Sequence, residues 1–560
     1  MVDYIINRFG MDAPTTQARS SIHYGHYSEV KQTVPSWSGF QAIVHPSIPG
    51  ITNVGYCPMI DGSPTEFNTV YTVLKHAQAI SLDMLDQSET VITFDLAIYV
   101  KAKEIQWRRP DEFSNVTIRL GGFHIAMNYL ALLGKLHRSS GLDDLLVEAG
   151  VYGCNTTSVV LSGKSYNRGV RAHKLVMEAL LRCQWQCFAK WLTEQEGVPN
   201  EEEISQTMKD CLSNISDGHA NDDDISKLLD MMEDPIGLFG TFRTEARSKS
   251  QLYTFWDNYI CMVQLLLRFI RAERTGNWDE HLAATGSMIP FFFGMDRPNY
   301  SRWLPVYVDD MRLLCDRHPS VHTELAGGPH AVSRSKTPFA QVWTDMALEQ
   351  SVNLDSKKKG GIIGISRKKA ALQRWFLTCH ERASILSRLK EMCDIDSSDV
   401  VGTRTDATSG RMEADEKCFA KMVSMLASSE TMHNPFHIDD SETMPLLNIA
   451  SGVVLPSEKA TRLLLVYKLG VTQMLEFIDQ RLHTNDLSFW DAIPNLKIDT
   501  FATKLKQKRK SVADNQQVTS ADRNLFGRLV LSAQTRAIDM RQLLKYELST
   551  VPYSLAHADG

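Results

Sequence analysis

The sequence lacks the paired cysteines and the excess of positive charge that would suggest a zinc module or a basic nucleic-acid-binding protein. Its ten cysteines include no Cys-x-x-Cys pair, whereas a zinc framework normally needs two closely spaced pairs of ligands. Cys183 and Cys187 are spaced for one face of a helix, which is typical of buried thiols. Lys and Arg number 60 against 66 Asp and Glu, a net charge of −6. Any nucleic-acid binding therefore has to come from local patches.

Long apolar runs, targeting signals and several well-known catalytic motifs are also missing. The most apolar stretches, such as residues 259–270, are shorter than the ~20 residues that cross a bilayer. The N-terminus has no basic region followed by an apolar core, so it does not read as a signal peptide. Residues 162–165 resemble the end of a P-loop, but Ser158 stands where that motif requires glycine. We expect an intracellular, soluble protein with reduced thiols and no membrane partner.

The first third of the chain has an α/β pattern. Short β-rich runs alternate with segments of helical period, in the order β-β-α-β-α-β-α: 39–45, 53–60, 65–86, 89–95, 96–107, 115–120 and 122–137. This order predicts helices packed on a mixed sheet.

After residue 140 the pattern becomes almost entirely helical. Helices are predicted over 167–196, 224–232, 251–273, 340–352 and 368–393, with amphipathic helical character over 418–482 and a last helix over 521–547. The acidic tract 201–234 is typical of a solvated linker. We divide the chain into an N-terminal arm (1–34), the first part of an α/β core (35–138), an all-helical insertion (139–335), the last core helices with a basic loop (336–393), a flexible linker (394–417) and a helical C-terminal region (418–560).

Two residues stand where α/β folds present reactive groups. Asp95 closes the apolar run 91–94, and it is either a catalytic acid at a strand end or the N-cap of the next helix. His124 follows the Gly121-Gly122 turn, whose glycines allow close backbone approach, and it either works chemically or only packs the turn. If their strands are parallel neighbours, both residues lie at the same edge of the sheet.

Asp345 and Glu349 are four residues apart, so a helix places them on one face. Like charges at that spacing repel each other. A divalent cation or a basic partner would relieve the repulsion. The alternative is a pair of solvated acids on a polar helix face.

A basic segment follows these acids, and it contains Lys357, Lys358, Lys359, Arg367, Lys368, Lys369 and Arg374 around a Gly-Gly turn, with Trp375 interleaved. Such a cluster can neutralise the phosphates of a nucleic acid, or it can be a solvated loop. The run 504–510 is a second basic strip, typical of a nuclear address or of phosphate contact.

The order of these pieces resembles the transposase cores with a ribonuclease H-like fold, above all the hAT-like and Mutator-like groups. In those families an Asp in the middle of the domain begins a helix and a Cys/His-containing turn follows. A helical insertion then precedes the last catalytic Glu. More narrowly, the blocks at 93–102, 119–130 and 296–307 are similar to an uncharacterised transposon-derived family with many animal copies and fungal relatives.

The resemblance implies a ribonuclease H-like α/β core over residues 35–393, with DNA as the partner, a nuclear location and scope for a homodimer. It makes Asp95 the second catalytic acid, Glu349 the third and His124 the histidine of the turn, with Asp345 beside them and Mg²⁺ or Mn²⁺ held by Asp95 and Glu349. The first acid is expected near residues 35–44, where Ser38 and Gly39 stand instead, and Asp61 is the nearest substitute. Two-metal phosphoryl transfer needs bridging carboxylates, so this departure puts catalysis in question.

Three hypotheses remain open from the sequence. The first is a transposase-derived nucleic-acid-binding protein that has lost catalysis. The second is an active metal-dependent transposase that cleaves and transfers strands. The third is a helical protein-interaction scaffold in which the same residues are structural. A sheet formed by residues 35–135 and touching the 340–352 helix favours the first two.

Overall fold

The described part of the protein is predominantly helical and contains a small two-stranded parallel sheet. The computed structural model describes residues 36–55, 57, 60, 62–194, 237–350, 352–357, 362, 366, 368–393, 408–427, 432–437, 443–503, 530, 533, 536, 539 and 542. Up to residue 192 the elements are α3 (Trp37–Val44), α4 (Phe67–Gln78), the π-helical segment η1 (Ala79–Met84), β1 (Thr90–Phe94), α5 (Leu96–Arg108), β2 (Val116–Leu120), α6 (Gly122–His137), α7 (Leu142–Glu148), α8 (Cys154–Leu161) and α9 (Tyr166–Leu192).

After residue 192 isolated β-bridges occur, and the elements with described bounds are helical. They are α12 (Gln251–Thr275), α13 (Trp278–Gly294), α14 (Pro298–Arg312), α15 (Leu314–Arg317), α16 (Pro319–Ala326), α17 (Thr344–Glu349), α18 (Val352–Lys357), α20 (Lys369–Leu377), α21 (Cys379–Met392), α22 (Ser409–Ala427), α23 (Ser457–Leu464), α24 (Val466–Ile478) and the π-helical segment η3 (Asp479–His483).

The sheet consists of β1 and β2, which are parallel neighbours with Thr90 paired to Val116 and Phe94 to Leu120. Parallel strands need a long crossover, and α5 provides it and contacts both strands. Every residue of β2 is buried, which accounts for its nearly continuous apolar run. The predicted strands at 89–95 and 115–120 and the helices at 65–86, 96–107 and 122–137 are thereby confirmed to within a few residues.

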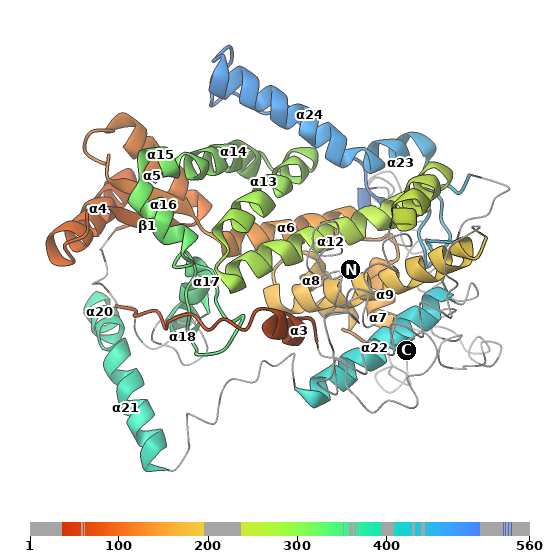
Figure 1. The fold of residues 1–560 in the computed structure, drawn as a ribbon, viewed down its shortest axis with the longest axis horizontal. Coiled ribbons are helices and arrows are strands. Elements are labelled where there is room, and N and C mark those ends of the chain that lie inside the picture. Colours follow the sequence, from red (N-terminus) through yellow and green to blue (C-terminus); the bar gives the residue numbers. More distant parts are fainter. Residues whose placement is uncertain are drawn as a thin grey trace, which may run out of the picture.

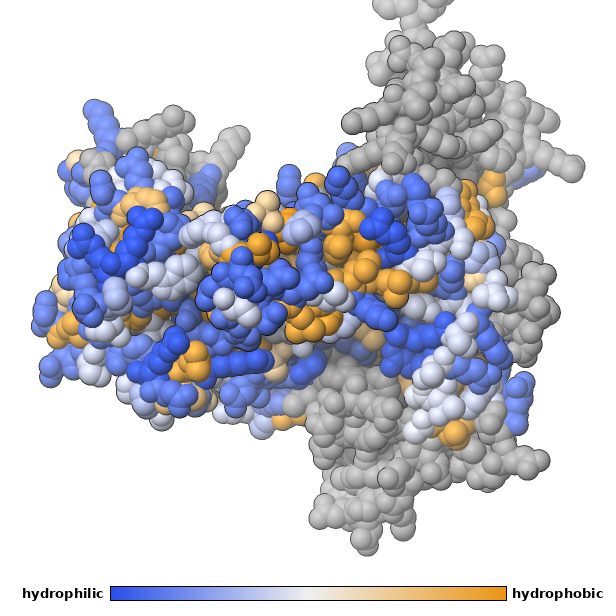
Figure 2. Space-filling model, turned by 90° about the horizontal axis from the view of Figure 1, so that it is seen from above, coloured by the Kyte–Doolittle hydropathy of each residue, from blue (hydrophilic) through white to orange (hydrophobic). Residues whose placement is uncertain are grey.

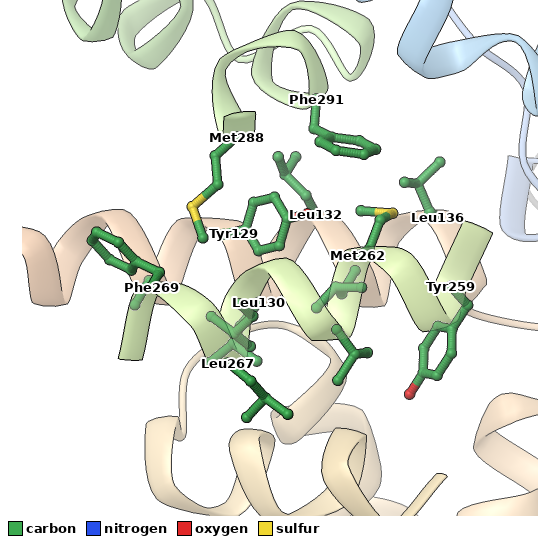
Figure 3. Close-up of a cluster of buried hydrophobic side chains, with 14 of the residues drawn as sticks. Tyr129, Leu130, Leu132, Leu136, Tyr259, Met262, Leu267, Phe269, Met288 and Phe291 are labelled. Carbon is green, nitrogen blue, oxygen red and sulfur yellow. The ribbon is translucent and has the colours of Figure 1, made fainter. Parts of the chain in front are cut away.

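The main core is formed by α6, α12 and α13, which contact one another. Figure 3 shows the side chains that meet there: Tyr129, Leu130, Leu132 and Leu136 of α6, Tyr259, Met262, Leu267 and Phe269 of α12, and Met288 and Phe291 of α13. Around this core α9 packs against α12 and α22, while α24 packs against α13 (Figure 1). The C-terminal region therefore rests on the helical insertion.

Local residues define the ends of the central helices. The Ser250 side chain accepts a hydrogen bond from Tyr253 N at 3.0 Å and begins α12. Gly276 ends the same helix with φ 70°, a left-handed conformation that favours glycine. Asn277 follows at once and accepts from Glu280 N at 3.0 Å, so α13 begins after a very short turn.

The predicted strand over 39–45 is wrong, because Trp37–Val44 form helix α3. The Ser36 hydroxyl accepts a hydrogen bond from Gly39 N at 3.2 Å and caps this helix. The Trp37 ring then packs edge-on against Phe339, with ring centroids 5.4 Å apart. A cap and a tertiary contact outweigh the β propensity of this short run. The described residues between 51 and 60 form no strand either, so the sheet described here is parallel and not mixed.

Other predicted boundaries also change. The helix predicted over 340–352 is α17 alone, because Phe339 has φ 56° and Val342 forms an antiparallel bridge with Val332 before the helix begins. Residues 409–417, assigned to a flexible linker, belong to α22. Within 418–482, the described residues between α22 and α23 are not helical. The predicted helix at 224–232 and the basic run 504–510 lie outside the described residues.

The surface seen in Figure 2 is largely hydrophilic, with hydrophobic residues in a broken band across the middle. This is the upper face, on which α24 lies in Figure 1, and Tyr467 and Leu475 of α24 are 46% and 56% exposed. None of the described helices is both long and apolar enough to cross a membrane.

Replacing Gly470 by alanine tests the packing of α24 on α13. A Cβ at Gly470 would lie 1.9 Å from the carbonyl oxygen of Pro290, so the two helices must separate. We expect Gly470→Ala to lower the free energy of unfolding by about 1–3 kcal/mol or more, measured by denaturant titration. The matched control is Gly410→Ala in α22, where a Cβ meets nothing within 4 Å. Equal stability of the two variants would contradict this packing.

Candidate functional site

The carboxyl ends of β1 and β2 lie side by side and bring two predicted site residues to one edge. Gly121 N donates a hydrogen bond to Phe94 O at 2.8 Å, directly beyond the last pair of the sheet. Asp95 follows β1, and His124 lies in the first turn of α6 after β2. The strands β1 and β2 are thus parallel neighbours, which was the condition for Asp95 and His124 to lie at the same edge. Asp95 also acts as an N-cap, since its Oδ1 accepts from Ile98 N at 3.0 Å.

Asp345 reaches the same edge from α17, more than 200 residues later in the chain. Its Oδ1 accepts a hydrogen bond from Phe123 N at 3.1 Å, and its Oδ2 accepts one from His124 N at 3.2 Å. The Asp345 Oδ2 also lies 2.9 Å from His124 Nδ1. The N-cap residue Gly121 has no side chain to satisfy these amides, so Asp345 caps α6 from a distant segment. A carboxylate is favoured there because a helix N-terminus carries partial positive charge.

The two glycines of the turn make room for α17. A Cβ on Gly121 would lie 2.3 Å from Asp345 Oδ2, and one on Gly122 would lie 2.2 Å from Trp343 Cδ1. Gly121 has φ −65°, an ordinary value, so close approach and not backbone conformation requires glycine here. The Trp343 indole is buried and packs against Phe269 with ring centroids 5.3 Å apart.

Three carboxylates surround His124. Its hydrogen bond with Asp345 raises the pKa of His124, partial burial opposes that increase, and the negative charges of Asp345, Asp95 and Glu349 raise it further. The imidazole is 34% exposed and the Asp345 side chain 10%. Asp95, Asp345 and Glu349 therefore lie close enough to His124 to act on its charge.

Tyr300 of α14 also lies at this edge. It was not predicted as a site residue, because no catalytic motif includes it. Its hydroxyl accepts a hydrogen bond from Asn128 Nδ2 at 3.0 Å, and the same nitrogen donates to His124 O at 2.9 Å. Burial raises the pKa of Tyr300, and the charges of Asp345 and Asp95 raise it further. The phenol stays protonated and can donate a hydrogen bond to an acceptor at the edge.

Glu349 and Asp345 are neutralised by different partners. Asp345 pairs with His124, whereas Glu349 Oε2 lies 3.8 Å from Lys357 Nζ in the last turn of α18. Glu349 Oε1 also accepts a hydrogen bond from Asn353 Nδ2 at 3.0 Å. The repulsion expected between two acids at this spacing is thus relieved by two basic side chains.

The basic segment is partly described. Lys368, Lys369 and Arg374 are exposed at the start and in the last turn of α20, whereas Lys358, Lys359 and Arg367 lie outside the described residues. Trp375 lies beneath the Arg382 guanidinium, 4.1 Å from the ring centroid. In Figure 1 the pair α20 and α21 projects from the lower left of the molecule, near α18.

The donors at the strand edge do not make a compact metal site. Within the described part of the chain, one group of three His, Cys, Asp or Glu has ligand atoms within 4.8 Å of one another, and it is Glu273, His281 and His330. In α3 the Ser38 hydroxyl accepts from Arg274 Nη1 at 3.0 Å where the first acid was expected, and Asp61 is not described. Asp345 already accepts bonds from two amides and pairs with one imidazole.

Glu273, His281 and His330 were missed because no local spacing unites them. They come from the end of α12, the start of α13 and the segment after α16. The short turn through Gly276 and Asn277 was the one sequence signal for this cluster. It connects two buried helices and brings Glu273 of α12 close to His281 of α13.

A family model described as Domain of unknown function (DUF8702) matches residues 36–547. The chain belongs to this family. No curated protein and no solved structure matches it. The DUF8702 match covers the strand edge, the helical insertion, α17 and the basic segment, so the geometry described above lies within one family domain.

The pairing of His124 with Asp345 predicts a pH-dependent contribution to stability. Because the pKa of folded His124 is raised, the contribution is complete below the unfolded value of about 6.5 and is lost as the pH rises through the folded value. We expect Asp345→Asn to cost more free energy of unfolding near pH ~6 than near pH ~9. The difference should not exceed about 1 kcal/mol, since the pair is partly screened by solvent.

Asp296→Asn is the matched control for urea titrations at these two pH values. The Asp296 carboxylate also accepts two backbone N–H bonds, from Leu496 at 2.7 Å and Lys497 at 2.9 Å, but both of these donors are amides and neither is an imidazole. Its cost should be the same at both pH values. An Asp345→Asn cost that is independent of pH would contradict the pairing.

Proposed function

We propose that this DUF8702 protein is a transposase-derived nucleic-acid-binding protein with a ribonuclease H-like core that no longer cleaves DNA. The order of elements supports the proposal: β1, Asp95, α5, β2, the Gly121-Gly122 turn and α6, then a helical insertion and α17. This is the order that the resemblance to hAT-like and Mutator-like transposases implies. A nuclear location follows from the same proposal.

One observation carries the proposal above the others. The helix α17 returns from the far end of the insertion and places Asp345 against the first turn of α6, with Glu349 one helical turn later. A scaffold whose acids were merely solvated would not need one glycine to admit a distant carboxylate and a second to admit the indole of Trp343. The last acid of the resembling families also lies on a helix after the insertion.

The basic segment provides the nucleic-acid contacts. It begins at Lys357, which lies beside Glu349, and continues through the exposed Lys368 and Arg374. Positive side chains on a helical projection can pair with successive phosphates of a duplex, and such binding weakens steeply with salt. Because the whole chain has a net charge of −6, this local cluster must supply the attraction.

The donors at the strand edge favour binding over cleavage. Two-metal transfer needs carboxylates that bridge two cations ~3.5–4 Å apart. Here Asp345 is engaged as a helix cap, Glu349 pairs with Lys357, and Ser38 stands in a helix where the first acid was expected. The residues present do not supply the donor set for Mg²⁺ or Mn²⁺, so we assign no chemical step to this edge.

The active transposase is the second candidate, and a specific observation favours it. Asp95, Asp345 and Glu349 all act on His124, which means that three acids gather at the ends of the strands. If a fourth carboxylate joins them when DNA is bound, the edge regains a bridging donor. The two candidates differ in whether the protein cuts DNA.

Charge reversal in the basic segment tests the binding proposal. We expect the double variant Lys368→Glu/Arg374→Glu to weaken binding to duplex DNA at least about tenfold and to reduce the salt slope by about 2, measured by fluorescence anisotropy. The control Lys417→Glu/Lys468→Glu makes the same charge change at exposed sites on α22 and α24, outside this segment. Equal loss in both variants would mean that only the overall charge matters.

Plasmid nicking in Mn²⁺ decides between the two candidates. We expect no nicking by the wild type above the level of a heat-inactivated sample. If nicking occurs and Asp95→Asn abolishes it, the protein is an active nuclease, and the hypothesis of a non-cleaving binding protein is wrong. Asparagine is as good an N-cap as aspartate, so this variant keeps α5 intact. Circular dichroism provides the folding control.

A further inference from the structure

Glu273, His281 and His330 form a buried cluster, and Arg119 of β2 donates a hydrogen bond to the backbone oxygen of His330. Their side chains are 2%, 1% and 0% exposed. The Glu273 Oε2 lies 3.1 Å from His281 Nδ1 and 3.7 Å from His330 Nε2, and one ligand atom from each residue falls within 4.8 Å of the others. Two imidazoles and one carboxylate are therefore aimed at one point in a dry part of the molecule.

The hydrogen bond at the far side of His330 fixes its tautomer. His330 Nδ1 lies 3.2 Å from Leu325 O, and a carbonyl can only accept, so Nδ1 carries the proton. In the neutral ring Nε2 then presents a lone pair. This atom is buried without a hydrogen-bond partner and faces the Glu273 carboxylate. Two acceptors facing each other in a dry site lack a cation or a proton between them.

His281 is oriented in the same way. If its Nδ1 points at the cluster, the proton on Nε2 can donate to the Tyr307 hydroxyl, which lies 3.2 Å away. A second partner on the outer nitrogen is the usual arrangement of a metal-ligating histidine. Each imidazole of this cluster thus has one nitrogen directed inward and one held from outside.

Burial disfavours charge on all three groups when they stand alone. It raises the pKa of Glu273 to about 7 and lowers the pKa values of His281 to about 3 and of His330 to about 4. Arg119 does not ion-pair with Glu273 in any described contact. Its guanidinium lies over the Trp278 ring at 5.2 Å and donates to His330 O at 2.9 Å.

We propose that Glu273, His281 and His330 bind a divalent transition-metal ion, with zinc as the best fit. A tetrahedral zinc ion ~2.0–2.1 Å from its ligands holds them about 3.3 Å apart, and the two distances from Glu273 Oε2 lie on either side of that value. Mg²⁺ and Ca²⁺ prefer all-oxygen ligands, so two imidazoles select against them. The three ligands leave one coordination position for water.

The metal would stabilise the packing of the helices that support the strand edge. It would join the end of α12, the start of α13 and the segment around residue 330, and α12 carries Phe269. The Phe269 ring lies 5.2 Å from the His281 ring and 5.3 Å from Trp343, which precedes α17. A cavity of about 420 Å³ lined by Arg271, Trp278 and Glu280 lies beyond the Trp278 ring, which stacks on the His281 ring with centroids 5.3 Å apart.

Zinc content of the purified full-length protein tests the proposal. After equilibration with zinc and removal of the unbound ion, we expect one tightly bound zinc per chain in the wild type. Glu273→Gln and His330→Gln should each weaken zinc binding by more than the roughly 10–100-fold that loss of an outer partner costs. His173→Gln is the control, since His173 is equally buried but bonds to Tyr259 outside the cluster.

Two measurements on the wild type keep the proposal testable if a variant does not fold. Cobalt(II) should bind with the visible absorption of a four-coordinate nitrogen–oxygen site, and zinc should displace it. Chelation should lower the melting temperature, because a metal that binds only the folded state stabilises it. A wild type that retains no zinc overturns the proposal, and so does retention of zinc by both Glu273→Gln and His330→Gln, which would indicate cysteine binding instead.

Discussion

The hydrogen bonds from the first turn of α6 to Asp345 are the constraint on which the rest of the site depends. They join residues separated by 222 positions in the chain, so the whole helical insertion has to bring its two ends together. Closing so long a loop costs conformational entropy that a single contact does not repay. The aromatic packing of Trp343 against Phe269 adds attraction, and the glycine turn leaves the space that Asp345 and Trp343 occupy.

The insertion is therefore a structural part of the strand edge. The helices α12 and α13 form the core with α6, and Phe269 of α12 supports Trp343 just before α17. A change in the buried core can therefore alter the strand edge through this contact. The buried cluster of Glu273, His281 and His330 lies next to this contact, because the His281 ring packs on Phe269. A change in the cluster therefore reaches Trp343 through Phe269.

The two groups of ionisable residues differ in kind. At the strand edge Asp95, Asp345 and Glu349 are half-buried, and each has a protein partner: an amide, an imidazole or a lysine. In the buried cluster the His330 Nε2 atom has no hydrogen-bond partner and lies 3.7 Å from the Glu273 carboxylate. Carboxylates that already have protein partners have fewer lone pairs left for a cation, whereas a buried imidazole nitrogen without a hydrogen-bond partner beside a carboxylate favours a transition metal.

Local sequence determined much of the architecture. The periodicity predicted α6 at residues 122–137 and the two strands, because these segments are buried on the faces that their patterns indicate. It placed Asp95 and His124 at one edge on the condition that their strands are parallel neighbours, and the structure shows that pairing. The position of Asp95 directly before a helical segment indicated an N-cap as one of two roles. The structure confirms that Asp95 caps α5.

Tertiary structure decided the rest. The run at 39–45 has β propensity but forms α3, because Ser36 caps it and Phe339, far along the chain, packs on Trp37. Asp345 looked like a surface acid or a metal ligand and is a cap for a helix 222 residues away. No spacing unites Glu273, His281 and His330. Side-chain periodicity reports only which face is buried, whereas the partner on that face depends on how distant segments pack.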